Sequence, residues 1–163
     1  MAVFRQLRNY PDWLESSYRF VDWFFRKLDP VIRKVGYWRV DYWMRFPERV
    51  SKGTIFDCQM CGQCTLHFTG MTCPMTCPKN LRNGPCGGVR SNGHCEVKPE
   101  IKCVWMEAYQ RSTKMNIYGN GIYEIQVPLN HQLKVSSAFI NILRSADDGV
   151  PDVWKSMESE PLQ

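Results

Sequence analysis

The first third of the chain repeats apolar and charged positions with the period of an α-helix. One helical face carries the apolar residues Leu14, Val21, Phe25 and Leu28. Another face carries charged residues in favourable i,i+4 order, as the pairs Glu15–Arg19 and Asp22–Arg26. Asp12 is the predicted N-cap, because Glu15 three residues later completes a capping box. This pattern predicts an amphipathic helix that starts near residue 12.

A second helix is predicted from residue 30 to about residue 47. Asp29 supplies an N-cap, and Pro30 stands at the first helical position, where proline is well tolerated. Despite Gly36, one face of this helix carries Val31, Val35, Trp38 and Tyr42. Pro47 marks the predicted end. The two segments together predict a helical hairpin.

Aromatic side chains are concentrated in this hairpin, since residues 1–57 hold 14 of the 21 Phe, Trp and Tyr residues. Apolar stripes at helical spacing usually belong to a core, so the first interpretation is that they pack inward and cover the following region. A second interpretation is a docking surface for a partner or a membrane interface, because residues 1–50 combine aromatic rings with Arg and Lys.

The last third contains weaker signals. Pro99 and Glu100 suit the first turn of a helix that continues to about Arg111. Residues 119–121 predict a turn, and the alternation over residues 123–127 predicts one short strand. Ser136 or Ser137 is expected to cap a short helix that runs through Leu143. Beyond Ala146 the chain is acidic and poor in apolar residues, so a flexible tail is predicted.

All eight cysteines lie within one stretch of 46 residues: Cys58, Cys61, Cys64, Cys73, Cys77, Cys86, Cys95 and Cys103. The same stretch contains six glycines and four prolines, so regular secondary structure alone is not expected to fold it. Thiolates are soft metal ligands, and eight of them are enough for two four-ligand sites. Bound metal is therefore the predicted means of holding these loops.

The spacing of the first three cysteines decides between metals. Structural zinc usually takes pairs of cysteines separated by a loop, whereas Cys58, Cys61 and Cys64 stand at equal short intervals. Three such sulfurs, with a distant cysteine on the fourth iron, are typical of iron–sulfur cubanes. The next cysteine comes later than in a simple ferredoxin. We therefore favour one or two [4Fe-4S] clusters and keep zinc as the alternative or second metal.

Other roles for these residues are weaker hypotheses. Disulfides are disfavoured because we expect no secretory signal. His67 and His94 lie among the cysteines, and with eight thiols available we expect them near the ligands or at the surface, as we do for His131 outside that stretch. A Cys64 nucleophile paired with His67 is conceivable, but metal ligation accounts for every cysteine. We expect no independent catalytic site.

Composition limits the choice of partner only loosely. The 163 residues are 44% hydrophobic and 23% charged, with a net charge of +5. A basic balance permits an acidic partner, so a zinc-stapled adaptor that binds nucleic acid or another polyanion is the second functional hypothesis. No base-reading module is recognisable, and acidic residues alternate with basic ones. No transmembrane helix is expected, and we predict a cytoplasmic protein.

The cysteine motifs themselves resemble one known family. They are CQMCGQC at residues 58–64, TGMTCP at 69–74, CPKNLRNGPCGG at 77–88, GHCEV at 93–97 and CVW at 103–105. Together they are similar to the C-terminal, cysteine-rich domain family of methylenetetrahydrofolate reductase. This family includes the small subunits of two-subunit bacterial reductases. The resemblance covers about residues 55–112 and leaves the aromatic N-terminal segment unexplained.

The resemblance implies a non-catalytic, metal-binding subunit that docks on a flavoprotein reductase of one-carbon metabolism. Flavin, as FMN or FAD, is expected on the partner subunit only, and an iron–sulfur cluster would pass electrons to it. The implied ligands are Cys58, Cys61, Cys64 and one or more of the later cysteines.

The expected fold is small, α-rich and loop-rich, with little β-structure and an N-terminal hairpin packed on a metal-stapled region. The expected segments are 1–54 helical, 55–112 metal-binding, 113–146 partner-docking and 147–163 tail.

Overall fold

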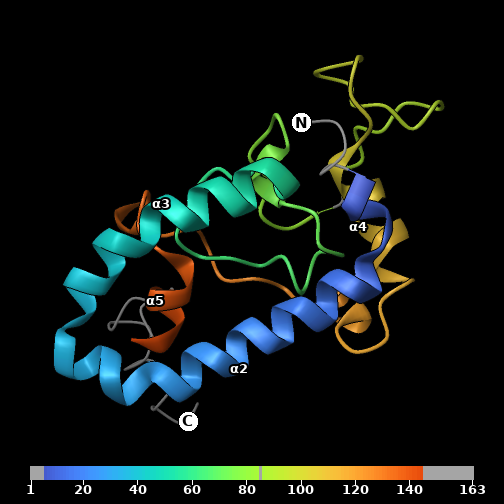
Figure 1. Ribbon diagram of the computed structural model, residues 1–163. Helices are drawn as coiled ribbons and strands as arrows, with labels where there is room; N and C mark the ends of the chain where they lie inside the picture. The colour runs from blue at the N-terminus through green and yellow to red at the C-terminus, as the bar shows by residue number, and fades with distance from the viewer. Residues whose placement is uncertain (1–5, 85, 145–163) are drawn as a thin grey trace, which may run out of the picture.

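Two long helices frame the protein in the computed structural model, which describes residues 6–84 and 86–144. Helix α2 (Pro11–Val35) follows the short 3-10 helix η1 (Leu7–Asn9), and α3 (Tyr37–Phe56) follows α2 directly. Figure 1 shows α2 and α3 diverging like the arms of a V from the short break between them. Gly36 has a φ of +96°, a conformation that residues with a β-carbon rarely adopt. The predicted hairpin is confirmed.

The predicted boundaries inside this hairpin are wrong. Pro30 lies within α2 and Pro47 within α3, and the chain breaks at Gly36 instead. Asp29 is not an N-cap, because its carboxylate pairs with Arg33 at 2.7 Å and accepts a 2.6 Å hydrogen bond from the Tyr37 hydroxyl. The pair with Arg33 lies within α2, and the bond from Tyr37 spans the break at Gly36. Helix α2 starts at Pro11, with Tyr10 as its N-cap in place of Asp12.

Helix α5 (Ala138–Leu143) lies in the angle between α2 and α3 and contacts both of them (Figure 1). Its N-terminus is capped by Ser137, as predicted, whose hydroxyl accepts from the backbone N–H of Ile140. Two buried carboxylates of α3 hold this end in place. Asp41 accepts from the Ser137 N–H at 2.7 Å, and Glu48 accepts from the Ser137 hydroxyl at 2.6 Å. The V is thus closed by charge-assisted hydrogen bonds.

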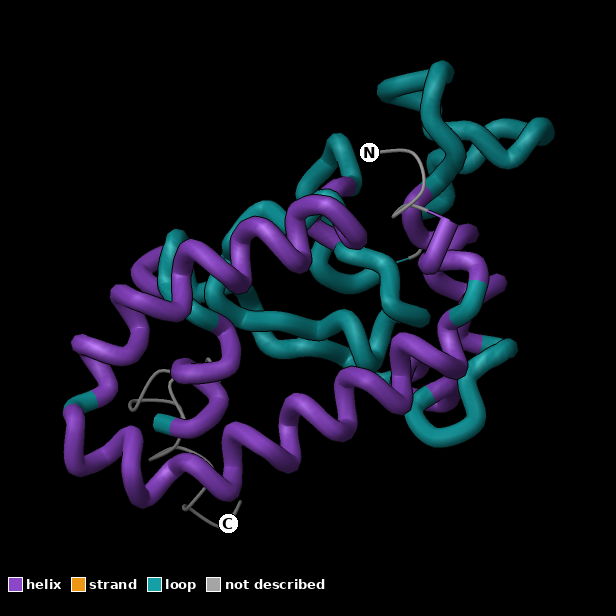
Figure 2. The backbone as a smooth tube through the Cα atoms, viewed as in Figure 1, coloured by secondary structure: helices purple, strands orange, loops and turns teal. Residues whose placement is uncertain are grey.

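The remaining elements are short. Helix α4 (Val104–Ser112) begins after Cys103, later than the predicted start at Pro99, and three 3-10 helices complete the set: η2 (Pro74–Thr76), η3 (Gly119–Tyr123) and η4 (His131–Leu133). The predicted strand over residues 123–127 is wrong. Its Gln126 forms backbone hydrogen bonds of 2.8 Å with both side-chain groups of Asn83, so no second strand pairs with it there. Loops dominate the centre of the molecule (Figure 2).

Strand structure is almost absent from the described ranges, where two isolated bridges join Val89 to Cys95 and His94 to Lys102. The helix-rich fold with little β-structure is therefore as predicted. No helix in these ranges combines the length and the apolar composition that a membrane span requires. The predicted tail, 147–163, lies outside the described residues. The division into four segments stays a prediction.

Glu15 joins the N-terminal helix to the C-terminal third. Its side chain is 1% exposed, and its carboxylate accepts from three consecutive backbone N–H groups: Asn116 at 3.0 Å, Ile117 at 3.0 Å and Tyr118 at 2.6 Å. The predicted pair with Arg19 is therefore wrong. The predicted pair of Asp22 with Arg26 is confirmed, at 2.8 Å.

Many of the hairpin's aromatic residues face outward. The predicted stripe of Val31, Val35, Trp38 and Tyr42 is exposed, so the interpretation that these four residues pack into the core is wrong. Trp38 and Phe46 on α3 are 74% and 76% exposed. The core instead forms two clusters. One contains Leu14, Leu66, Met71, Cys73 and Met115, and the other contains Cys77, Cys103, Val104, Trp105 and Ala108.

Candidate metal centre

Four of the eight cysteines line one pocket at the end of α3. They are Cys58, Cys61, Cys64 and Cys73. Cys58 follows α3 directly, and the chain then turns back on itself so that Cys73, nine residues after Cys64, returns to the same pocket. Sequence spacing had grouped the first three. The fold supplies the fourth.

Left-handed backbone conformations produce the turns of this loop. Asp57 and Met60 have φ values of 52° and 49°, and Gly62 has a φ of 77°. Such strain in non-glycine residues is concentrated at functional sites. Gly62 is also required sterically, because a β-carbon there would lie 2.1 Å from the carbonyl oxygen of Leu133. The Met60 N–H approaches the Cys58 sulfur at 3.4 Å, a contact of the kind that stabilises thiolates.

The thiols of this pocket are free and largely buried. Burial raises the pKa of Cys58 to about 12 and that of Cys73 to about 11, and it also raises the pKa of Cys61. Neighbouring sulfurs raise the pKa in the same direction in all three cases. A metal that binds here must therefore displace protons from the thiols.

A buried ion pair adjoins the four sulfurs. The Lys52 ammonium lies 2.6 Å from a carboxylate oxygen of Glu48, and both residues line the cysteine pocket. Burial opposes the positive charge of Lys52, but the sulfurs of Cys64 and Cys58 and the carboxylate of Glu48 outweigh this effect and raise its pKa. The sequence offered only the Glu-x3-Lys spacing as a signal, which usually marks a solvent-exposed pair.

The other four cysteines are less tightly grouped. Cys77 and Cys103 belong to one buried cluster beside α4. Cys86 and Cys95 both lie within electrostatic range of Lys79, which pairs with Glu96. They belong to loops that project away from the helices at the upper right of Figure 1. The structure therefore brings Cys58, Cys61, Cys64 and Cys73 around one pocket and places Cys77 and Cys103 in a separate buried cluster.

The histidines occupy three different settings. His94 lies in a turn, where its ring contacts the carbonyl oxygen of Asn92 at 3.2 Å, and His131 lies in η4 and is exposed. His67 is enclosed by aromatic rings, and burial lowers its pKa to about 4, so the ring is uncharged at neutral pH. None of the three lines the four-cysteine pocket.

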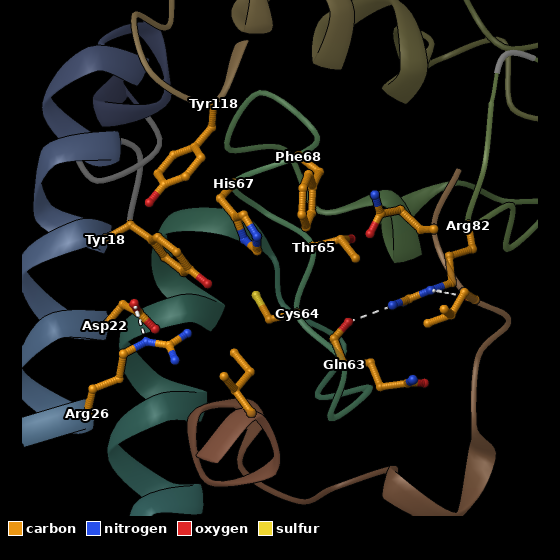
Figure 3. Close-up of a pocket in the computed structure, with 13 residues that line it drawn as sticks. Tyr18, Asp22, Arg26, Gln63, Cys64, Thr65, His67, Phe68, Arg82 and Tyr118 are labelled. Carbon is orange, nitrogen blue, oxygen red and sulfur yellow. Dashed lines mark hydrogen bonds and ion pairs between the residues drawn. The ribbon is translucent and has the colours of Figure 1, made fainter. Parts of the chain in front are cut away.

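His67 faces a second and larger cavity of about 320 Å³ between α2 and the cysteine loop. Figure 3 shows Tyr18, His67 and Tyr118 at one end of this cavity and Arg82 at the other, with Cys64 and Phe68 between them. Cys64 lines both cavities. Gln63, Cys64 and Thr65 therefore separate the four-cysteine pocket from this open groove. Sequence reasoning missed this groove, because its walls come from distant segments.

The donor set of the first pocket fits an iron–sulfur cluster in chemistry. It offers four soft sulfur ligands, an N–H donor to one sulfur and a buried cation to balance negative charge. Over residues 6–84 and 86–144, no three His, Cys, Asp or Glu side chains are grouped so as to hold one metal ion. Ligands of a cubane bind four different irons and so stand farther apart than ligands of a single ion.

Over the part of the chain that the structure describes, the fold and this site define a helix-rich protein, with almost no strand, that contains a pocket lined by four cysteines. A model of the family described as methylene-tetrahydrofolate reductase C terminal matches residues 37–132, and the chain belongs to this family. The match starts at the first residue of α3 and includes all eight cysteines, while α2 lies outside it. The comparisons with curated proteins and with solved structures gave no match.

Proposed function

We propose that this chain is an iron–sulfur accessory subunit that docks on a flavin-containing methylenetetrahydrofolate reductase. The family's name links the chain to that reductase and to folate metabolism. The observation that carries the proposal is the convergence of Cys58, Cys61, Cys64 and Cys73 on one pocket. This is the arrangement expected of a loop with three closely spaced cysteines and a distant Cys-Pro ligand.

In this proposal the four cysteines hold a [4Fe-4S] cluster, which would supply one-electron chemistry to the complex. Lys52 lies beside the sulfurs as a fixed positive charge, and Glu48 holds it there at 2.6 Å. A buried cation favours the more negative, reduced state of a nearby group. Cys77, Cys86, Cys95 and Cys103 are the proposed ligands of a second cluster or a zinc ion.

The exposed aromatic face of α3 is the proposed docking surface for the flavoprotein. Trp38, Trp43 and Phe46 are large, rigid and exposed, and such residues are enriched in protein interfaces. They lie within residues 37–132, the part of the chain that defines the family. A partner common to the family is therefore the proposed occupant, and peripheral membrane contact through residues 1–50 is the alternative outcome of the test.

Metal analysis of anaerobically purified protein tests the cluster. We expect a brown protein that absorbs near 400 nm, a region approximately typical of thiolate-bound clusters, with iron and acid-labile sulfide in equal amounts. Cys64→Ser should remove the iron of the first site, and Cys86→Ser should leave that iron in place. A colourless protein with zinc and no iron would reject the electron-transfer role.

Copurification tests the docking surface. The chain is co-expressed with a flavin-containing methylenetetrahydrofolate reductase, and both are recovered through a tag on this chain. Trp43→Ser with Phe46→Ser should release the flavoprotein, whereas Val97→Ser, which changes an exposed apolar residue on the projecting loops, should retain it. If the double variant retains the flavoprotein, the proposed surface is wrong. It is also wrong if this chain floats with anionic liposomes and forms no complex with the flavoprotein.

A further inference from the structure

The outer face of α2 carries a row of exposed apolar side chains. Trp13, Phe20, Phe24 and Val31 are 46–64% exposed, and they follow one another at intervals of 7, 4 and 7 residues. Such intervals bring the four side chains to one line along a helix of about 3.6 residues per turn. The buried side chain of Leu14 lies about 100° around the helix from this row and belongs to the core. The row is therefore separate from the core-facing stripe of α2.

The aromatic rings on this face contact one another at the surface. Phe20 and Phe24 stack with centroids 6.5 Å apart, and Trp23 adjoins Phe20 with a centroid distance of 6.0 Å. The Lys27 ammonium lies 5.4 Å from the centroid of the Trp23 ring, so a cation joins the aromatic cluster. All four side chains are exposed. An exposed apolar patch with polar groups at its edge is typical of an interaction site.

The exposed charges of α2 are almost all positive. Its exposed basic residues are Arg19, Arg26, Lys27, Arg33 and Lys34. Of its four acidic residues only Asp12 is exposed, and the other three bond to backbone N–H groups or to arginines. Within the described ranges, no carboxylate pairs with Lys27 or Lys34. The outer face of α2 therefore complements a surface that carries negative charge.

The residue types on this face favour a lipid surface over a protein. Lys27 and Lys34 each stand three residues after a member of the apolar row, and lysine is depleted in protein interfaces. Lysine side chains lay their carbon stems along apolar surface and extend the ammonium group outward. Trp13 and Trp23 are the second signal, because tryptophan is enriched where lipid headgroups meet hydrocarbon. Together these residues are typical of a helix that lies on a membrane.

We propose that the outer face of α2 binds the surface of an anionic lipid bilayer. The helix lies parallel to the bilayer, with its rings between the headgroups and the acyl chains and its lysine ammonium groups at the lipid phosphates. In Figure 1 most of α2 runs along one edge of the described part of the molecule. The inference goes beyond the proposed function, which gives α2 no role, and the proposed flavoprotein surface lies on α3. Helix α2 also lies outside the residues that match the family model.

Vesicle flotation of the full, anaerobically purified chain tests the proposal. One set of vesicles is phosphatidylcholine with roughly one-third phosphatidylglycerol, and the other is phosphatidylcholine alone. We expect the chain to float with the anionic vesicles and to bind the neutral vesicles at least about tenfold more weakly. Raising the salt from about 0.1 M to about 1 M should weaken the anionic binding, because the charges are then screened. Absence of flotation with the anionic vesicles at low salt would overturn the proposal.

Matched lysine variants locate the charge contacts. Lys27→Gln with Lys34→Gln should weaken binding to anionic vesicles about twentyfold, since each lysine near the surface contributes about fivefold. The control, Lys98→Gln with Lys114→Gln, removes two exposed lysines outside α2 and should leave the affinity unchanged. Equal losses in the two pairs would show attraction by net charge alone and would refute the site.

Matched apolar variants locate the rings. Phe20→Ser with Phe24→Ser should weaken binding at least about tenfold, because the buried apolar area is lost. The control, Val97→Ser with Ile125→Ser, removes two exposed apolar side chains from loops and should bind as the unchanged chain does. If the phenylalanine variant binds as tightly as its control, the rings do not enter the bilayer and the proposal is wrong.

Tryptophan fluorescence shows which helix lies at the bilayer. Lipids with brominated acyl chains should quench the emission of the bound chain. Trp13→Phe with Trp23→Phe keeps aromatic rings on α2, so flotation should persist while most of the quenching disappears. Trp38→Phe with Trp43→Phe, at exposed positions on α3, should retain the quenching. The reverse result would place the membrane contact on α3 and contradict the assignment to α2.

The same variants separate this inference from the proposed function. Trp43→Ser with Phe46→Ser should release the flavoprotein and still float with anionic vesicles. Phe20→Ser with Phe24→Ser should retain the flavoprotein and no longer float. A chain that binds the flavoprotein but never floats would keep the proposed function and lose this inference. If Phe20→Ser with Phe24→Ser releases the flavoprotein, the outer face of α2 is a protein interface and the membrane proposal is wrong.

Discussion

Glu15→Gln should destabilise the protein far more than its position on an N-terminal helix implies. The Glu15 carboxylate accepts three backbone N–H groups of the segment 116–118 at 2.6–3.0 Å while being 1% exposed. One carboxylate oxygen serves Ile117 and Tyr118, and the other serves Asn116. A glutamine keeps one oxygen acceptor and places an NH₂ group against the remaining N–H.

The size of the effect follows from these contacts. One hydrogen bond to a charged group is lost, which costs about 1.5–3 kcal/mol, and an N–H donor is left facing another donor. The two retained bonds lose the negative charge that strengthens them, since charge-assisted bonds are roughly twice as strong as neutral ones. We therefore expect a loss of about 3 kcal/mol in the free energy of unfolding. That is a large fraction of the 5–15 kcal/mol that is typical of a domain.

Urea unfolding followed by circular dichroism measures this loss, on preparations of equal metal content. The matched control is Asp12→Asn, which removes one negative charge from the exposed first turn of the same helix. Its cost should be about 0.3–1 kcal/mol, from the helix dipole alone. Hydrogen exchange adds a local readout, because the amides of 116–118 should lose protection in Glu15→Gln only. If the free energies of unfolding of the two variants differ by less than about 0.5 kcal/mol, the inferred role of Glu15 is wrong.

Three further predictions concern the site. Lys52→Met should lower the reduction potential of the proposed cluster by tens of millivolts, since about 1.4 kcal/mol corresponds to about 60 mV for one electron. Redox titration measures this shift. The exposed control Lys134→Met should leave the reduction potential unchanged. Gly70→Ala should lower the free energy of unfolding in urea by at least about 2 kcal/mol more than Gly93→Ala does. Both glycines have positive φ, but only at Gly70 would a β-carbon lie 2.3 Å from a carbonyl oxygen. Because burial lowers the pKa of His67 from 6.5 to about 4, its neutral form contributes stability above pH 6.5 that is lost as the pH falls toward 4. His67→Phe should abolish that part of the pH dependence of the free energy of unfolding. If the variant keeps the same pH dependence, the inferred role of His67 is wrong.

Local sequence rules located the cysteine site but not its full composition. Equal spacing grouped Cys58, Cys61 and Cys64, because three residues in a short loop cannot lie far apart. The fourth member was open among five later cysteines. Cys73 takes that place because the chain reverses at Gly70 and Met71, which have φ values of 58° and 52°. A left-handed methionine has no sequence signature, so this turn could not be predicted.

Proline rules failed for a different reason. Pro30 and Pro47 were expected to bound a helix, yet both lie inside one. Each removes one hydrogen bond and crowds the preceding turn, but long helices gain most of their stability from tertiary packing. Asp29 adds local support, because it pairs with Arg33 within α2 and accepts a hydrogen bond from Tyr37 across the break. The true break at Gly36 needs a φ that glycine adopts readily, and this was the more reliable signal.

Long-range contacts of charged residues also escaped prediction. Glu15 bonds to residues about one hundred positions away, and Asp41 and Glu48 bond to Ser137. Asp41 pairs with Arg45 and Glu48 pairs with Lys52 at i,i+4 spacing, which is usual for solvent-exposed pairs. What the spacing cannot convey is that these carboxylates are buried and also bond to remote N–H and hydroxyl groups.

The two long helices therefore bury charged groups as well as apolar ones. Their buried faces carry the carboxylates Glu15, Asp41 and Glu48, each satisfied by hydrogen bonds, and their exposed faces carry rings such as Trp38, Trp43 and Phe46. Helical periodicity identifies a face but not the direction in which it points, so the sequence pattern fitted either orientation. Since large apolar patches are uncommon on isolated soluble proteins, the outward rings argue for a covering partner. Helix α2 carries a similar outward stripe but lies outside the family match, so any contact made by α2 would be particular to this chain.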